Sequence, residues 1–195
     1  MQTVTRYPFT SVKTEGGLLP TDLLQRIADG DNLPGLRPVD YHLYEGERVN
    51  EAVNRAWNRC VGAWKGFKEQ SEKLAATDSG TSLTRERWLL VLFQELGYGR
   101  LPALRSGLAA GDTSFPISHL WQTTPIHLVT FRQGLDQRSE VSTAVKRSPH
   151  SLMQEFLNRS PEHQWGIIAN GLTLRILRDN ASLRRAAFVE FDLAS

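Results

Sequence analysis

The stretch WGIIANGLTLRILRD, Trp165–Asp179, predicts a β-hairpin. Two apolar runs flank the pair Asn170-Gly171, and Asn-Gly between such runs is the strongest short-range hairpin signal. Both central residues of the type I′ turn that this pair favours need positive φ, which Asn and Gly tolerate. Side chains alternate along a strand, so Arg175 and Arg178 are expected on opposite faces. The predicted core residues of this region are Trp165, Ile167, Ile176 and Phe188.

The segments around the hairpin predict a helix and further strands. SPHSLMQEFLNRS is typical of a helix with Ser148 as its cap and Pro149 at its first position. TSFPISHLW and TPIHLVTF before this helix, and RRAAFVEFDL after the hairpin, are short and rich in β-forming residues. SLTRERWLLVLFQELGYG predicts an earlier helix that Ser82 or Thr84 caps and that the glycines of LGYG end. From this helix onward the predicted order is α-β-β-α-β-β-β.

The first part of the chain predicts helices. PTDLLQRIADG indicates a short helix, and the residues before it are polar, Gly-rich and expected to be irregular. A long helix is predicted from about Asn50 to Ala76, where apolar residues recur every three or four positions. Its apolar stripe consists of Val53, Trp57, Cys60, Val61, Trp64 and Phe67. We expect a helical N-terminal extension over residues 1–80 and an α/β domain over residues 81–195.

The composition is typical of a globular protein. The chain has 195 residues, of which 40% are hydrophobic and 23% are charged, and its net charge is +2. No apolar run approaches the ~18 residues of a membrane span, and the N-terminal residues lack the apolar core of a signal peptide. The single cysteine, Cys60, excludes an internal disulfide and a zinc cluster of the usual spacing. We therefore expect a cytoplasmic protein without a membrane partner, in which Cys60 is a buried or half-buried thiol.

Common nucleotide-binding and hydrolase motifs are absent from the sequence. It contains no G-x-x-x-x-G-K-[ST], no G-x-G-x-x-G, no G-x-S-x-G and no H-E-x-x-H. These absences exclude the usual phosphate loops, the nucleophile elbow of the α/β-hydrolases and the zinc-protease helix.

The predicted order of elements matches the restriction-endonuclease-like core. In that core an Asp at the end of one strand and an acid-x-Lys on the next strand hold Mg²⁺ and orient the attacking water. The second of these strands here is PIHLVTFR, which has no acid and no lysine, and none of the five lysines of the chain has an acid two residues before it. Mg²⁺ requires oxygen ligands, so this strand cannot hold the metal. His127, Thr130 and Arg132 remain there to face a phosphate.

The fold class that we expect is therefore α/β. A helical N-terminal part precedes a restriction-endonuclease-like α-β-β-α-β core with a C-terminal hairpin, and the usual nuclease chemistry of this core has been lost.

The histidines leave a metal-dependent alternative open. His119 and His127 lie on the two adjacent predicted strands, where each could instead form ordinary hydrogen bonds at a strand end. A metal site needs a third ligand. Asp112 or Asp136 is available for that role, although the spacing selects neither of them. An active metal-dependent nuclease with Asp112, His119 and His127 as ligands is thus one alternative function.

SPHSLMQEFLNRSPEHQWGIIANGLTLRILRDNASLRRAAFVEFDL resembles the N-terminal region of large bacterial restriction-modification adenine-specific DNA methyltransferases. These include the phage-defence types of DISARM-like and BREX-like systems. The shared features are a helix like PHSLMQEFLNRS, a Trp-Gly-hydrophobic strand, an Asn-Gly turn, an Arg-containing strand and an aromatic-acid-Asp-Leu ending. LLVLFQELGYGRL and FPISHLW with PIHLVTF also look similar, so that the resemblance covers about Leu83 to Leu193.

The resemblance implies a nuclease-like domain attached to an S-adenosylmethionine-dependent methylase. The catalytic Asn-Pro-Pro-aromatic motif of that family, and its Gly-rich motif for the methyl donor, do not occur in this sequence. S-adenosylmethionine is therefore expected to bind only downstream of Ser195, with no catalytic residue, metal or cofactor in this chain. The chain ends directly after an apolar strand, which we interpret as the front part of a longer protein. Its expected partners are double-stranded DNA and the downstream methylase domain or defence-system subunits.

Cations in the second half of the chain predict DNA engagement. From Arg132 to Arg185 the sequence holds nine basic and five acidic residues, which permits a phosphate-facing surface. A helix N-terminus also favours a phosphate, which adds the residues at the start of the SPHSLMQ helix. The candidate DNA-binding residues are Arg132, Arg138, Lys146, Arg147, His150, Arg175 and Arg178.

Two alternatives to DNA contact remain open at this point. The Arg175 stem can pack on the sheet while its head lies in water. The whole chain can also be a protein-protein interaction module without DNA contact, and in that case the long-helix stripe of Val53, Trp57, Trp64 and Phe67 would be partly exposed.

Overall fold

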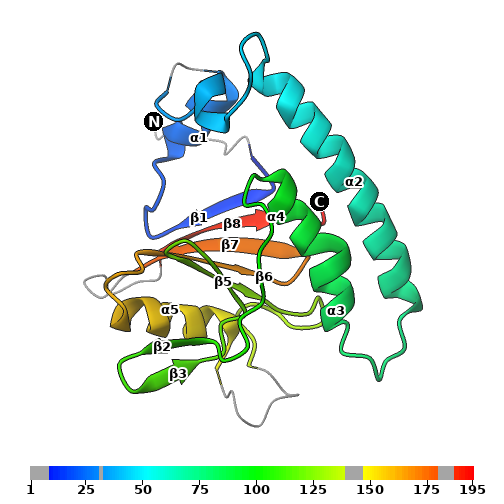
Figure 1. Ribbon diagram of the computed structural model, residues 1–195, viewed down its shortest axis with the longest axis vertical. Helices are drawn as coiled ribbons and strands as arrows, with labels where there is room; N and C mark the ends of the chain where they lie inside the picture. Colours follow the sequence, from blue (N-terminus) through cyan, green and yellow to red (C-terminus); the bar gives the residue numbers. More distant parts are fainter. Residues whose placement is uncertain (1–8, 31–32, 139–146, 180–186) are drawn as a thin grey trace, which may run out of the picture.

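The computed structural model describes residues 9–30, 33–138, 147–179 and 187–195 (Figure 1). Its helices are α1 (Thr21–Ala28), α2 (Val49–Lys73), α3 (Thr81–Thr84), α4 (Leu90–Glu95) and α5 (Pro149–Arg159), with a 3₁₀ helix η1 (Pro38–Tyr41) and a π-helical segment η2 (Arg85–Leu89). Its strands are β1 (Val12–Glu15), β2 (Leu108–Ala110), β3 (Thr113–Phe115), β4 (His119–Trp121), β5 (Thr124–Leu128), β6 (Trp165–Ala169), β7 (Thr173–Arg178) and β8 (Phe188–Asp192). The chain is a mixed α/β structure with a helical N-terminal part, which confirms the fold class at this level.

Six of the described strands form one mixed sheet in the order β1-β8-β7-β6-β5-β4, and β2 and β3 form a separate hairpin. β5 and β6 are parallel, with Ile126 opposite Ile167, and α5 connects them. The other neighbouring pairs of the sheet are antiparallel. β1 pairs with β8, which places Val12 opposite Phe191. The expectation that the residues before Pro20 are irregular is wrong for residues 12–15, because this four-residue edge strand offers too few positions for a recognisable alternation.

Helices cover both faces of the sheet (Figure 1). On one face α2, η2 and α4 form a hydrophobic core with the strands, which includes Phe67, Trp88, Phe93, Ile126 and Ile167. On the other face α5 and the β2–β3 hairpin form a second core, which includes Phe115, Met153, Phe156, Ile168 and Leu177. β6 and β7 contribute to both cores, β6 through Ile167 and Ile168 and β7 through Leu174 and Leu177.

α2 confirms the predicted long helix. Its stripe is buried only toward its C-terminal end, where Phe67 is 1% exposed and Cys60 is 8% exposed. Val53 and Trp57 near its N-terminal end are 55% and 65% exposed. The reason is that α4 ends opposite Arg59, so the earlier turns of α2 extend beyond the helix against which they would pack. No described helix, α2 included, is both long and apolar enough to cross a membrane.

The helix predicted from SLTRERWLLVLFQELGYG exists, but it starts differently. It begins after Gly80 rather than at a Ser82 or Thr84 cap. Thr84 is buried inside the helix, where its hydroxyl donates to Gly80 O and accepts from the N–H of Phe131. The next five residues form the π-helical turn η2, and Gly97 with φ +87° follows the end of α4. The sequence-predicted stop at this glycine is confirmed.

α5 and the hairpin after it confirm their predictions except for the type of turn. Ser148 caps α5 through its hydroxyl, which accepts from Ser151 N at 3.1 Å. Between β6 and β7, only Gly171 has positive φ, and the N–H of Asn170 donates to Thr173 O at 3.1 Å. This places Gly171 at the first central position, as in a type II′ turn. The predicted type I′ turn is wrong because the side chain of Asn170 instead accepts from the N–H groups of Leu172 and Thr173.

Trp165 is not a core residue, contrary to the prediction. It is the first residue of β6 and is 38% exposed. Arg178 lies opposite it on β7, with its guanidinium 5.4 Å from the ring centroid. Ile167 and Phe188 are buried as expected, and Ile176 is partly buried against the core of the α2 side.

Replacing Gly171 with alanine is expected to destabilise the protein more than the same change at Gly97. Both glycines have similar positive φ, +88° and +87°, so the backbone strain of about 1 kcal/mol is shared. A Cβ at Gly171 would lie 2.9 Å from Thr84 Cγ2, whereas a Cβ at Gly97 meets nothing within 4 Å. Thr84 is buried, so we expect Gly171→Ala to cost about 1–2 kcal/mol more in urea unfolding. Equal losses in the two variants would contradict a tight contact between the turn and α3.

Candidate functional site

The carboxyl ends of the parallel strands β5 and β6 lie at one edge of the sheet, and α5 begins nearby. β5 ends at Leu128, opposite Ala169 of β6, and the N–H of Val129 donates to Ala169 O at 2.9 Å. α5 follows β5 along the chain and starts at Pro149. Ligands of open α/β sheets bind outside the carboxyl ends of the strands. This edge is therefore the first place at which to expect a site.

A pocket of about 200 Å³ opens at this edge. Its volume is several times the ~30 Å³ share of one water molecule in the liquid. The residues that line it are Thr81, Arg85, Pro116, His127, Val129, Thr130, Gln133, Arg147, Pro149 and Leu152. Two of them are arginines and none is Asp or Glu, so the fixed charges of the pocket wall are positive.

Arg85 reaches the end of β5 from η2. Its Nε and Nη2 atoms both donate to the main-chain oxygen of Leu128, at 2.9 and 2.6 Å. Burial lowers the pKa of this guanidinium. Within the described part of the chain, no carboxylate pairs with it. A partly buried cation without a counter-charge is unfavourable unless an anion joins it, so this side chain indicates an anion site.

The two strand histidines lie at or near the pocket as uncharged side chains. His119 is buried, and its Nδ1 lies 2.8 Å from the Ser118 hydroxyl. His127 lines the pocket, and its buried Nδ1 has no hydrogen-bond partner among the described residues. Burial, together with the positive charge of Arg85, lowers the pKa of each histidine to about 4. No metal-ligating group of three or more residues exists in the described chain, so Asp112, His119 and His127 do not assemble into such a set.

Arg132 connects the loop after β5 to the end of α2. Its Nη2 donates to Leu74 O and Ala75 O at 3.3 and 3.0 Å, and its guanidinium lies 5.2 Å from the centroid of the Phe131 ring. A cation beside the C-terminal carbonyls of a helix is favourable. The side chain is exposed but already has these main-chain partners.

Arg147 is the second cation of the pocket. Its Nε lies 3.0 Å from the Glu155 carboxylate, and its side chain is 46% exposed. Glu155 also pairs with Arg159, at 2.8 Å. Arg138 is exposed in the loop that follows β5. Lys146, the predicted neighbour of Arg147, lies outside the described residues.

The first amides of α5 are already used within the protein. Pro149 has no N–H, and the N–H of His150 donates to Leu135 O at 2.9 Å. The N–H groups of Ser151 and Leu152 both donate to Ser148, to its hydroxyl and to its carbonyl. The interpretation that these amides bind a phosphate is therefore wrong, and only the positive end of the helix dipole remains.

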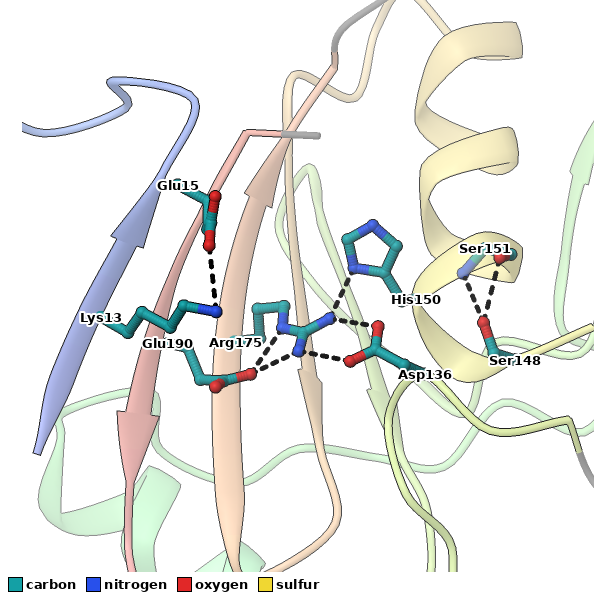
Figure 2. A network of polar contacts seen from close by, with 8 residues as sticks. All are labelled: Lys13, Glu15, Asp136, Ser148, His150, Ser151, Arg175 and Glu190. Carbon is teal, nitrogen blue, oxygen red and sulfur yellow. Dashed lines mark hydrogen bonds and ion pairs between the residues drawn. The ribbon is translucent and has the colours of Figure 1, made fainter. Parts of the chain in front are cut away.

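Arg175 lies inside a polar network rather than on the surface (Figure 2). It is 4% exposed, and it binds Asp136 through two hydrogen bonds of 2.7 and 2.8 Å and Glu190 through its Nε at 2.8 Å. Its Nη1 also donates to His150 Nδ1 at 2.8 Å. Burial alone would lower the pKa of Arg175, but the two carboxylates outweigh it and raise that pKa. Arg175 and His150 thus connect β7, β8, α5 and the loop after β5, and neither is available to a ligand in this arrangement.

Arg178 lies at the opposite edge of the sheet from the pocket. It pairs in register with Trp165, the first residue of β6, whereas the pocket lies at the carboxyl end of β5. Arg175 and Arg178 are three residues apart on β7, which places them on opposite faces as predicted, and Arg175 is buried while Arg178 is exposed. Of the seven candidate DNA-binding residues, the structure brings Arg147 to the pocket and places Arg132 and Arg138 on the loop that follows β5.

Comparisons with protein-family models, with curated proteins and with solved structures find no match for the chain. The chemistry of the pocket is the feature that points to a function. Sequence reasoning missed its central residue, Arg85, which contacts a strand 43 residues further along the chain. The residues one helical turn away are polar on one side (Thr81, Ser82) and apolar on the other (Trp88, Leu89), so the local sequence carries no signal for this contact.

Proposed function

We propose that this chain is a catalytically inactive, nuclease-like module that engages double-stranded DNA. Antiparallel β4 and β5, the crossover helix α5 and the parallel strand β6 follow in the order expected of a restriction-endonuclease-like core. If β5 corresponds to the strand that carries the acid-x-Lys in active nucleases, the pocket lies at the end of that strand, and this correspondence supports the proposal.

The observation that carries the proposal is the charge of this pocket. Arg85 and Arg147 line it, and among the described residues no Asp or Glu does. Mg²⁺ is bound by carboxylate and other oxygen ligands, whereas arginine is the side chain best suited to phosphate. A site with cations in place of acids favours holding a DNA phosphate over hydrolysing it.

We propose further that the module belongs to a restriction-modification or phage-defence adenine methyltransferase, in which S-adenosylmethionine binds a separate methylase region. The resemblance of the segment from about Leu83 to Leu193 supports this assignment. The sequence encoded after Ser195 tests it. An Asn-Pro-Pro-aromatic motif together with a Gly-rich motif is expected there, and any other kind of domain would contradict the assignment.

DNA affinity is expected to depend steeply on salt and on the cations beside the pocket. Each phosphate contact contributes about −0.9 to the slope of log K against log salt. The variant Arg138→Gln/Arg147→Gln should therefore weaken binding of a 20-bp duplex about tenfold and make the slope shallower by about 2. Fluorescence anisotropy between 50 and 200 mM salt measures both quantities.

A matched control removes two charges elsewhere. Arg55 and Arg59 lie on α2 and pair with Glu47 and Glu95, so Arg55→Gln/Arg59→Gln changes the net charge equally and should weaken binding less than about threefold. Equal losses in both variants, or no binding at 50 mM salt, would refute engagement at this edge. Mg²⁺-dependent plasmid cleavage that Asp112→Ala abolishes would instead support the metal-dependent nuclease.

The exposed end of α2 favours a second candidate, a protein-protein interaction module. Val53 and Trp57 are more than half exposed, as this alternative expects. A methylase body or a defence-system subunit could cover them. The same DNA titration separates the candidates, because an interaction module would show no salt-dependent affinity for the duplex.

A further inference from the structure

We infer that the pocket binds a phosphate oxyanion through two arginines, Arg85 and Arg147. Arg85 is fixed in place, whereas Arg147 is held by an ion pair with Glu155 (the latch) and turns to the oxyanion when it binds. The inference rests on the proposed function in that a DNA phosphate is the expected source of the oxyanion. Beyond that function, the Arg85 guanidinium is the group that binds the oxyanion, and the ion pair with Glu155 is the contact that restrains Arg147.

Arg85 is fixed because the end of β5 holds it. Two of its nitrogens share the main-chain oxygen of Leu128. A guanidinium has five N–H donors in a planar fork, so this single acceptor leaves donors on the same group for a second ligand. Nothing charged among the described residues supplies that ligand, although the group is partly buried. An oxyanion would provide both the missing acceptor and the missing counter-charge.

An ion pair with Glu155 holds Arg147 beside the pocket, and breaking this pair costs little free energy. The pair with Glu155 is partly exposed, at 46% for Arg147 and 25% for Glu155. Exposed ion pairs contribute little to stability. Glu155 also keeps its contact with Arg159 if Arg147 moves away. The release of Arg147 therefore leaves no unpaired carboxylate behind.

The remaining lining favours a tetrahedral anion over a cation. Thr81, Thr130 and Gln133 carry polar groups, and His127 is uncharged with an unpartnered Nδ1. Val129 and Leu152 add apolar surface, which lowers the local dielectric and strengthens the attraction of the arginines for an anion. Within residues 9–30, 33–138, 147–179 and 187–195, no carboxylate lines the pocket to repel it.

The test is a titration of the whole 195-residue chain with inorganic phosphate against chloride at constant ionic strength. The ¹H–¹⁵N signals of the arginine Nε–H groups report binding. Glu155→Gln removes the latch and should tighten phosphate binding about two- to fivefold. Arg85→Gln should weaken it at least about tenfold, and Arg85→Lys should weaken it less, since the charge remains but the planar fork is lost. Glu162→Gln removes one exposed carboxylate after α5 and should change the affinity less than about 1.5-fold.

Competition with a 20-bp duplex separates the inference from the proposed function. If phosphate binds with the expected pattern of variants and the duplex displaces it, both stand. If phosphate binds with that pattern but the duplex does not compete, the oxyanion site stands and DNA engagement there fails. If phosphate does not saturate the Arg85 signal, or if Glu155→Gln behaves like Glu162→Gln, the inference is overturned. DNA binding that survives in Arg85→Gln would then leave the exposed cations as its basis.

Discussion

Replacing Arg175 with methionine is expected to lower the free energy of unfolding by about 3 kcal/mol. The change leaves Glu190, whose side chain is 23% exposed, without its cation. It also removes a guanidinium that lies 4.2 Å from the centroid of the Phe188 ring. Asp136 adds less to the loss, because its side chain is 69% exposed and water can solvate it. Breaking one side of a buried pair is costly because the other charge remains buried.

Thermal and urea unfolding measure this loss. For a chain of this size about 3 kcal/mol corresponds to a decrease in Tm of roughly 6–12 °C. Arg178→Met is the matched control on the same strand, since its side chain is 51% exposed and should cost less than about 1 kcal/mol. Adding Glu190→Gln to Arg175→Met should recover part of the stability, because it removes the Glu190 charge that has lost its partner. A loss equal to that of Arg178→Met would show that the network does not hold β7, β8 and the loop after β5 together.

Acidification from pH 7 to pH 5 is expected to destabilise the fold through His119 and His127. In the folded protein their pKa values are about 4, whereas the ordinary value is 6.5. Between pH 6.5 and 4 the two histidines are therefore protonated in the unfolded chain but largely unprotonated in the folded chain. The stability is fully present above pH 6.5 and is lost as the pH falls toward 4. At pH 5 each histidine would cost about 2 kcal/mol if it titrated alone.

His150 and Asp136 determine the pH range over which this measurement should be made. Burial and the charge of Arg175 also lower the pKa of His150, which adds a loss of the same sign. Arg175 lowers the pKa of Asp136 below 3.8, so that carboxylate contributes only at a more acidic pH. Urea unfolding at pH 7, 6 and 5 should thus report the histidines. His127→Gln should flatten the pH dependence by about 2 kcal/mol. A wild-type stability that stays constant from pH 7 to 5 would contradict neutral histidines in the folded state.

Local signals were sufficient for three features of the fold. The Ser148 cap, the length of α2 and the β6–β7 hairpin follow from spacing within one segment, and the structure confirms them. The turn type was not predictable from Asn-Gly alone, because the Asn170 side chain also donates to Gln133 O, a partner outside the hairpin. Thr84 looked like a cap because its hydroxyl suits that role, yet its acceptor is Gly80 O one turn earlier in the helix.

The site was less predictable than the fold, because its charges are balanced by distant residues. Arg175 looked like a surface cation until the fold placed Asp136 and Glu190 on either side of it, 39 and 15 residues away. Arg85 showed the opposite behaviour, since nothing in its neighbourhood along the chain indicates that it lies at the end of β5. Whether an arginine is neutralised or left for a ligand depends on these long-range contacts.

The pairing of β1 with β8 has a consequence for the order in which the protein folds. Residues 12–15 find their partners only at residues 188–191. Synthesis proceeds from the N-terminus, so β1 leaves the ribosome long before β8 exists. Closing so long a loop is entropically slow. We therefore expect the helices and the β6–β7 hairpin to form first, with β1, the first of the described strands along the chain, as the last to join the sheet.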